Sequence, residues 1–136
     1  MCGIAGVFGL DNFPDGEART VASKMVDAMS HRGPNSKGSW SDDKNLALSH
    51  TRLSIFDTKS QEANQPLIDE HSGDALVFNG EIYNFRSLRS ELQSLEVCMH
   101  EFKTEGDSEV LFVALRTWGL DVTLHKLDGM FAFAWW

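Results

Sequence analysis

A cysteine stands at position 2, directly after the initiator methionine, in the opening stretch MCGIAGVFGL. Loss of Met1, which a small side chain at position 2 favours, would give Cys2 both a thiol and a free α-amine. An α-amine has a reference pKa of ~7.7–8.0, so part of it is neutral at physiological pH and can accept the thiol proton. Cys2 is therefore a candidate nucleophile that carries its own base, and a structural cysteine is the alternative that position alone leaves open.

Four further residues have the side chains or backbone groups that hydrolysis of an amino-acid amide needs. Asn79 and Gly80 could stabilise an oxyanion through a side-chain amide and a backbone N–H, although Asn-Gly is also a typical hairpin turn. Arg52 could bind a substrate α-carboxylate, or form a surface ion pair. Asp107 could bind the α-ammonium, or cap a helix. Residue spacing does not decide between these interpretations.

The elements that must position these residues are short strands mixed with helices. Short apolar runs bounded by polar turn residues predict strands, at residues 3–10, 38–40, 45–50, 52–57, 74–84 (with a turn at Asn79-Gly80), 97–104 and 129–136. Apolar residues at helical spacing predict three helices, which begin at the expected N-caps Asp15, Asn84 and Asp107. Hairpins outnumber regular strand–helix–strand units, so the order favours an α+β fold.

Composition excludes several classes of function. The 136 residues are enough for one domain, with 20 acidic and 12 basic residues and a net charge of −8. No cluster of Lys and Arg residues stands out, so binding to a nucleic acid or an anionic membrane is not expected. No apolar run approaches the ~18 residues of a membrane span. The two cysteines, Cys2 and Cys98, favour a reducing cytoplasm over a disulfide framework or zinc site, and Cys98 is expected in the core.

Several motifs occur together, in an order that matches a known family. The chain resembles the class II (N-terminal-nucleophile) glutamine amidotransferases over essentially all of residues 1–136, and in particular the glutamine-hydrolysing asparagine synthetase branch. The motifs that carry the resemblance are MCGIAGVF, HRGPN, RLSIFD, NQPL, NGEIYN, TEGDSEVL and LDGMFAFA. One departure is Asn35, where the family usually has an aspartate after HRGP.

The resemblance implies a fold and a reaction. The fold would be an αββα sandwich of antiparallel sheets, truncated at its C-terminal end, with residues 1–136 a partial glutaminase domain and the synthetase domain absent. Cys2 would form a γ-glutamyl thioester, with Asn79 and Gly80 as the oxyanion hole. Glutamine would be hydrolysed to glutamate and ammonia, which the missing domain would use for ATP-dependent asparagine synthesis.

The resemblance also implies how substrate and cofactors are bound. Arg52 would hold the glutamine carboxylate and Asp107 its ammonium, and the same pocket would be lined by Leu53, Ile55, Phe56 and Glu81. This domain would need no metal or cofactor, since ATP and magnesium would bind the synthetase domain, natively in the same chain. A homodimer is one assembly compatible with the family. The alternative function is an inactive remnant of the fold that serves as an interaction module.

Overall fold

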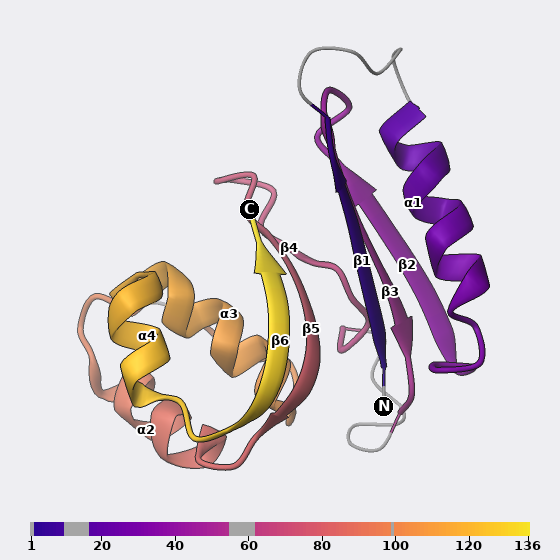
Figure 1. The fold of residues 1–136 in the computed structure, drawn as a ribbon. Helices are drawn as coiled ribbons and strands as arrows, with labels where there is room; N and C mark the ends of the chain where they lie inside the picture. The colour runs from indigo at the N-terminus through magenta and orange to yellow at the C-terminus, as the bar shows by residue number, and fades with distance from the viewer. Residues whose placement is uncertain (1, 10–16, 55–61, 99) are drawn as a thin grey trace. The chain divides into compact units, whose positions relative to one another are not determined.

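The structure is a computed structural model that describes residues 2–9, 17–54, 62–98 and 100–136 (Figure 1). Two antiparallel sheets are present, with strand orders β1-β3-β2 and β4-β5-β6. The elements in chain order are β1 (Gly3–Phe8), α1 (Glu17–Ala28), β2 (Ser36–Ser41), β3 (Leu46–Arg52), β4 (Leu67–Ile68), β5 (Ala75–Ile82), α2 (Phe85–Ser94), α3 (Asp107–Trp118), α4 (Leu120–Lys126) and β6 (Gly129–Trp135).

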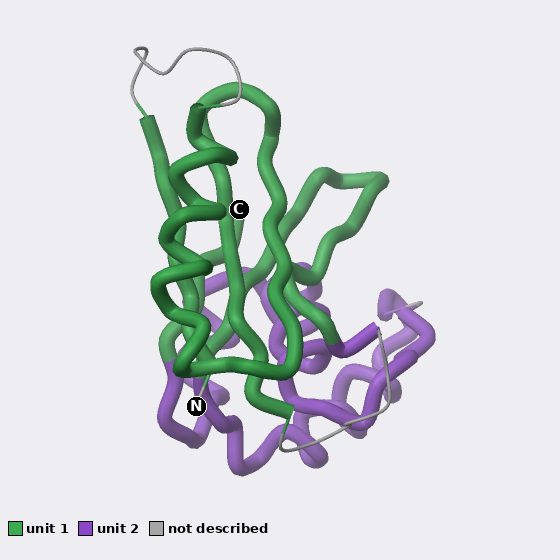
Figure 2. The backbone as a smooth tube through the Cα atoms, turned by 90° about the vertical axis from the view of Figure 1, so that its right-hand side faces the viewer, with its two compact units in different colours: residues 1–55, 64–79, 132–136 green, residues 56–63, 80–131 purple. Residues whose placement is uncertain are grey.

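The chain divides into two compact units (Figure 2). Unit 1 comprises residues 1–55, 64–79 and 132–136, and unit 2 comprises residues 56–63 and 80–131. The strands β5 and β6 each contribute residues to both units. The candidate site residues are therefore distributed over both units.

Unit 1 is layered around β3, whose seven residues are all buried. Successive side chains of a strand point to opposite faces of the sheet, so β3 contributes to two layers. On one face, Ala47 packs with Ala18 and Ala22 of α1. On the other face, the two sheets pack against each other through Leu46, Leu48, Ala75 and Val77. Helix, sheet and sheet thus form three successive layers.

Unit 2 is built around α3. Residues 108–115 of this helix are all buried, so the helix is enclosed on every side. The preceding helix, α2, is amphipathic and buries Leu88 and Leu92 as its spacing predicts. Leu95, expected on the same face, lies just beyond the last helical residue and is half-buried.

The predicted Asn79-Gly80 turn is wrong, because β5 continues through both residues. The reason is the neighbouring strand β6, which approaches Gly80 closely. A Cβ atom on Gly80 would lie 2.3 Å from the Met130 carbonyl oxygen and 2.5 Å from Phe131 Cα. Gly80 is therefore required by strand packing, and the local turn signal is overridden by tertiary contacts.

The predicted strand at 97–104 is also wrong for the residues described there. At the end of this segment, a side chain rather than a neighbouring strand accepts the backbone N–H groups of Lys103 and Thr104. The Glu109 carboxylate accepts hydrogen bonds from Lys103 N at 3.0 Å, Thr104 N at 2.7 Å and Thr104 Oγ1 at 2.7 Å. One buried carboxylate thus holds this segment in an irregular conformation.

Two predicted N-caps have different roles in the structure. Asp107 is the first residue of α3 and Gly106 the cap, while Asn84 occupies the cap position of α2 without a capping hydrogen bond from its side chain. The Asn84 side chain instead donates to Lys126 O at 2.8 Å and accepts from Asp128 N at 3.1 Å. Asp15 lies outside the described residues.

The remaining strand predictions are partly correct. The strand expected at 52–57 is wrong where the structure describes it, because β3 ends at Arg52 and the next two residues are irregular. Residues 55–57 lie outside the described part. The apolar C-terminal strand exists as β6, but it is half-buried rather than buried, because its side chains alternate between two faces and Met130 and Ala132 are exposed.

Candidate active site

Cys2 lies beside the C-terminal end of β3. The antiparallel pairing of β1 with β3 places Gly3 opposite Thr51, and so brings the residue before β1 next to the residues that follow β3. Leu53 N–H donates to Cys2 Sγ at 3.4 Å, and the thiol lies 3.8 Å from the Leu53 carbonyl oxygen. Cys2 is half-buried and not in a disulfide. Its thiol contacts two polar backbone atoms of Leu53, unlike a cysteine of an apolar core.

The HRGPN segment holds the backbone of Cys2. Arg32 Nε donates to the Cys2 carbonyl oxygen at 3.1 Å. Gly33 packs directly on β3, where a Cβ atom would lie 2.4 Å from the Thr51 carbonyl carbon. Arg32 therefore anchors the backbone of Cys2.

Asn35, the departure from the family pattern, keeps this loop in place. Its backbone N–H donates to Arg52 O at 3.0 Å, and its side-chain Oδ1 accepts from Ser54 N at 2.9 Å. An aspartate oxygen would accept the same bond. The amide therefore makes the side-chain hydrogen bond to Ser54 that an aspartate could also make.

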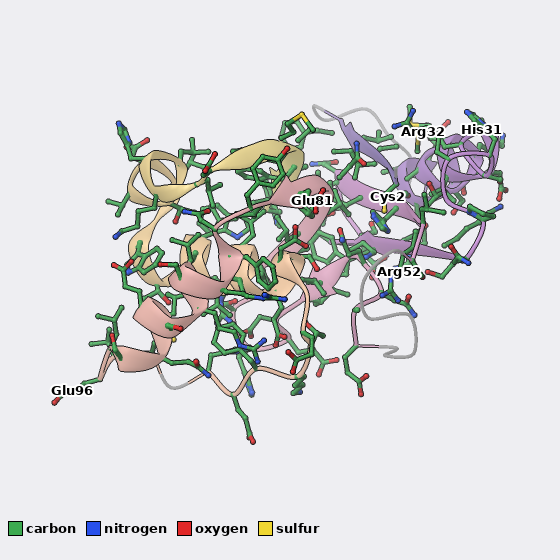
Figure 3. The ribbon with its side chains drawn as sticks, turned by 90° about the horizontal axis from the view of Figure 1, so that it is seen from below. Cys2, His31, Arg32, Arg52, Glu81 and Glu96 are labelled. Carbon is green, nitrogen blue, oxygen red and sulfur yellow. The ribbon has the colours of Figure 1, made fainter. Side chains whose placement is uncertain are left out.

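Arg52 is positioned at the same end of unit 1 as Cys2 (Figure 3). It is the last residue of β3 and only 8% exposed, so it does not lie on the surface, where the ion-pair interpretation expected it. Its NH1 group donates to Asn64 Oδ1 at 3.0 Å, and the same oxygen accepts from Ser36 Oγ at 2.9 Å. A buried, oriented guanidinium next to a thiol is suited to bind a carboxylate group of a substrate.

Asp107 and Glu81 form an acidic pair in unit 2. The Asp107 carboxylate accepts a hydrogen bond from Ile82 N at 2.9 Å. Burial raises the pKa of Asp107 above its usual value, and the negative charge of Glu81 raises it further, while backbone hydrogen bonds oppose both effects. A buried carboxylate beside a second acid favours a bound cation, such as an ammonium group.

The predicted site residues are divided between the two units. Unit 1 holds Cys2, Arg52, Leu53 and Asn79, and unit 2 holds Gly80, Glu81 and Asp107. The structure brings Cys2 and Leu53 into direct contact, with Arg52 adjacent in the chain. Met1, Ile55 and Phe56 lie outside the described residues. Cys98, expected in the core, is only half-buried.

Two buried polar residues were missed by the sequence analysis. His50 is 1% exposed and Gln65 is 7% exposed, and both belong to unit 1. The available signal was the polar stretch SHTR inside a strand that is buried along its whole length. Buried polar groups usually have hydrogen-bond partners, so such a run indicates a polar network.

Burial lowers the pKa of His50 to about 4, and the positive charge of Arg52 lowers it further, against a hydrogen bond to the Phe78 backbone. His50 is therefore neutral in the folded protein at neutral pH. In the unfolded chain its pKa is near the ordinary histidine value of 6.5. As pH falls from 6.5 to 4, the unfolded state gains a proton that the folded state does not, so stability is lost across this window.

We expect this loss to amount to about 3 kcal/mol of unfolding free energy, at roughly 1.4 kcal/mol per pKa unit. Urea unfolding at pH 7.5 and at pH 4.5 measures it, with His50→Asn as the matched variant that cannot titrate. The wild type should lose about 2–3 kcal/mol more than the variant between these two pH values. Parallel losses would show that His50 is not the group responsible.

None of the helices in the described ranges is both long enough and apolar enough to cross a membrane. Nor do these ranges contain a group of three or more histidine, cysteine, aspartate or glutamate side chains that could hold a metal ion.

Comparison with known proteins finds a family and relatives whose names both refer to glutamine. Residues 1–136 match the family described as the glutamine amidotransferase domain. The chain is 38% identical over 134 residues to asparagine synthetase B [glutamine-hydrolyzing] of Escherichia coli, covering 98% of this chain and 23% of that protein. It is 36% identical over 137 residues to asparagine synthetase [glutamine-hydrolyzing] 1 of Bacillus subtilis, covering 100% of this chain and 21% of that protein.

Other relatives extend the comparison. The amidase chry2 of Gibberella zeae is 36% identical over 147 residues, covering 100% of this chain and 21% of that protein. The chain thus spans about a fifth of the length of the curated relatives that it matches.

A solved structure supports the fold. The glutamine phosphoribosylpyrophosphate amidotransferase from B. subtilis superposes with a TM-score of 0.77 at 20% identity, over 98% of this chain and 34% of that one. With the two antiparallel sheets, this similarity confirms the predicted mixed α and β sandwich. The family match over the full sequence confirms the resemblance seen in the motifs. The chain belongs to the glutamine amidotransferase domain family.

Proposed function

We propose that this chain hydrolyses the side-chain amide of glutamine to glutamate and ammonia, through a thioester on Cys2. The observation that carries the proposal is the pairing of a half-buried thiol with a buried guanidinium at one end of unit 1. Cys2 Sγ contacts Leu53, the residue that follows Arg52. A nucleophile beside a carboxylate-binding cation fits an amide substrate that is itself an amino acid.

The reaction requires removal of Met1, so that the α-amine of Cys2 is free. The amine accepts the thiol proton, and the sulfur attacks the amide carbon of glutamine. The side-chain NH₂ of Asn79 and the N–H of Gly80 stabilise the resulting oxyanion. The amine then donates a proton to the departing nitrogen, so ammonia leaves and a thioester forms. Water hydrolyses the thioester to glutamate and the free thiol.

Recognition of the amino-acid end of glutamine uses two opposite charges. Arg52 binds the α-carboxylate and Asp107 binds the α-ammonium. The raised pKa of Asp107 supports this role, because a buried carboxylate gains from a bound cation. Leu53, Ile55, Phe56 and Glu81 line the same pocket in this proposal.

In this proposal, the site that uses the ammonia lies in another domain of a longer polypeptide. Because the relatives are glutamine-hydrolysing asparagine synthetases several times the length of this chain, we propose a synthetase domain in the same polypeptide. ATP and magnesium would act in that domain, and the glutaminase domain would need neither. A cytoplasmic location and a homodimeric assembly are further predictions of this proposal.

The Asp107→Asn variant tests the substrate assignment. We expect the KM for glutamine to rise about 10- to 100-fold, because a charge-assisted contact to the ammonium is lost. Asparagine keeps an oxygen that can accept the Ile82 N–H bond. Because the pKa of Asp107 is raised in the folded state, the wild type loses stability as pH rises through that pKa. Asparagine does not ionise, so the variant avoids this loss. The variant should therefore unfold at a temperature no lower than the wild type at pH 7.

Glutamate release and thermal unfolding measure the two effects, and Asp121→Asn is the control. Asp121 lies on the exposed surface of α4, so the same change of charge should leave KM unaltered. An unchanged KM in Asp107→Asn would refute the role of Asp107. If the wild type releases no glutamate from glutamine, the proposed function is wrong, and an interaction module becomes the better interpretation.

A further inference from the structure

The short strand β4 leaves part of β5 without a strand neighbour. β4 has two residues, and its register pairs Leu67 with Leu76 and Ile68 with Ala75. Continuing this antiparallel register by two residues places Gln65 opposite Phe78. The backbone groups of Phe78 on that side therefore need partners other than a β-strand.

Two buried side chains supply these partners. Gln65 Oε1 accepts the Phe78 N–H at 2.6 Å. His50 is hydrogen-bonded to the Phe78 backbone in a way that raises its pKa, as donation to the carbonyl oxygen does. Its Nε2 atom has no partner among the described residues, so the donor is Nδ1. Gln65 and His50 thus hold the backbone N–H and the carbonyl oxygen of Phe78.

The hydrogen bonds of Gln65 and His50 to Phe78 are next to two residues of the proposed site, Asn79 and Arg52. Phe78 immediately precedes Asn79 in β5. Asn64, the neighbour of Gln65, accepts the hydrogen bond from Arg52 NH1 at 3.0 Å. All of these residues belong to unit 1. The dipeptide Asn64-Gln65 therefore fixes Arg52 with one side chain and the strand that carries Asn79 with the other.

We propose that Gln65 and His50 are positioning residues for the oxyanion-stabilising amide of Asn79. By fixing the backbone of Phe78, they set the direction in which the Asn79 side chain leaves β5. The inference rests on the proposed glutaminase function for its catalytic consequence. A misplacement of about 1 Å in a catalytic group can cost about 10²-fold in rate, so a small loosening of this strand should be measurable.

The test compares variants that remove or keep the two hydrogen bonds. Gln65→Met removes the acceptor at similar side-chain length, and His50→Leu removes the donor. His50→Asn is the conservative variant, because its amide nitrogen can occupy the place of Nδ1. At a temperature where each variant is folded, we expect kcat to fall about 10- to 100-fold in Gln65→Met and His50→Leu, with KM within about threefold of the wild type. His50→Asn should recover kcat to within about threefold.

A purely structural role predicts a different result. The variants would unfold at lower temperature, but the folded fraction would keep its kcat, and that outcome would overturn the inference. An equal loss of kcat in His50→Asn and His50→Leu would also overturn it. If Gln65→Met does not fold, the comparison of the two His50 variants still tests the carbonyl half of the arrangement.

A measurement without substrate separates this inference from the proposed function. Two-dimensional NMR of the protein reports the side-chain NH₂ signals of Asn79 and the hydrogen exchange of the Phe78 amide. Removal of the Gln65 acceptor should shift or broaden the Asn79 signals and accelerate exchange at Phe78. Unchanged signals would refute the positioning role whether or not the wild type hydrolyses glutamine. Altered signals in a protein that lacks glutaminase activity would support the positioning role and reject the proposed function.

Discussion

The Cys2→Ala variant is expected to hydrolyse glutamine about 10⁴-fold more slowly than the wild type, or not measurably. Removing the nucleophile of a covalent mechanism leaves only binding and oxyanion stabilisation, which act weakly without an attacking atom. The methyl group of alanine also cannot accept the Leu53 N–H bond that Cys2 Sγ accepts. That bond is long, so stability should change by less than about 1 kcal/mol.

The same variant can be tested by intact-protein mass after reaction with a glutamine-mimicking diazoketone. The wild type should lose the mass of Met1 and gain one adduct, and Cys2→Ala should gain none. Cys98→Ala is the matched control, since Cys98 is the other half-buried free thiol and should not affect labelling. Labelling of the Cys2→Ala protein would contradict the assignment of the nucleophile. A wild type that retains Met1 would lack the base that the proposed mechanism needs.

The Asn79→Asp variant is expected to lower kcat about 10²- to 10³-fold, with a much smaller effect on KM. An amide donates to the developing oxyanion, whereas an ionised carboxylate can only accept and carries a repelling charge. The change conserves shape, and Asn79 is half-buried in the middle of β5, so the fold should persist. Because the oxyanion exists only after attack, the loss should appear in the chemical step.

Steady-state kinetics with glutamine, together with thermal unfolding, measure this prediction. Gln93→Glu is the control, since it makes the same amide-to-carboxylate change on the exposed face of α2. That variant should keep kcat. An Asn79→Asp variant with wild-type kcat would remove Asn79 from the oxyanion hole and leave the Gly80 N–H as the remaining proposed donor.

Local sequence signals failed where a distant segment satisfies the same backbone groups. The Asn79-Gly80 pair has the composition of a turn, yet β6 pairs across it and Gly80 provides the space for this contact. Asp107 is a residue type typical of N-caps, and its carboxylate does bond backbone groups at the start of α3, but it also accepts from Ile82 N, 25 residues away in the chain. Propensities describe the interactions available within a few residues, and tertiary hydrogen bonds replace or add to them at these positions.

Residue types and spacing along the chain were enough to predict the family and most of the helices and strands, and to single out Cys2 as the candidate nucleophile. Cys2 is recognisable because its chemistry depends on its position in the chain, and the helices are recognisable because their apolar spacing is local. The contact of Cys2 with Leu53, the burial of Arg52, and the hydrogen bonds of His50 and Gln65 to Phe78 depend on the tertiary structure. These contacts join residues that are 13 to 51 positions apart. Their partners are chosen by strand register and sheet packing, which the spacing of residues along the chain does not specify.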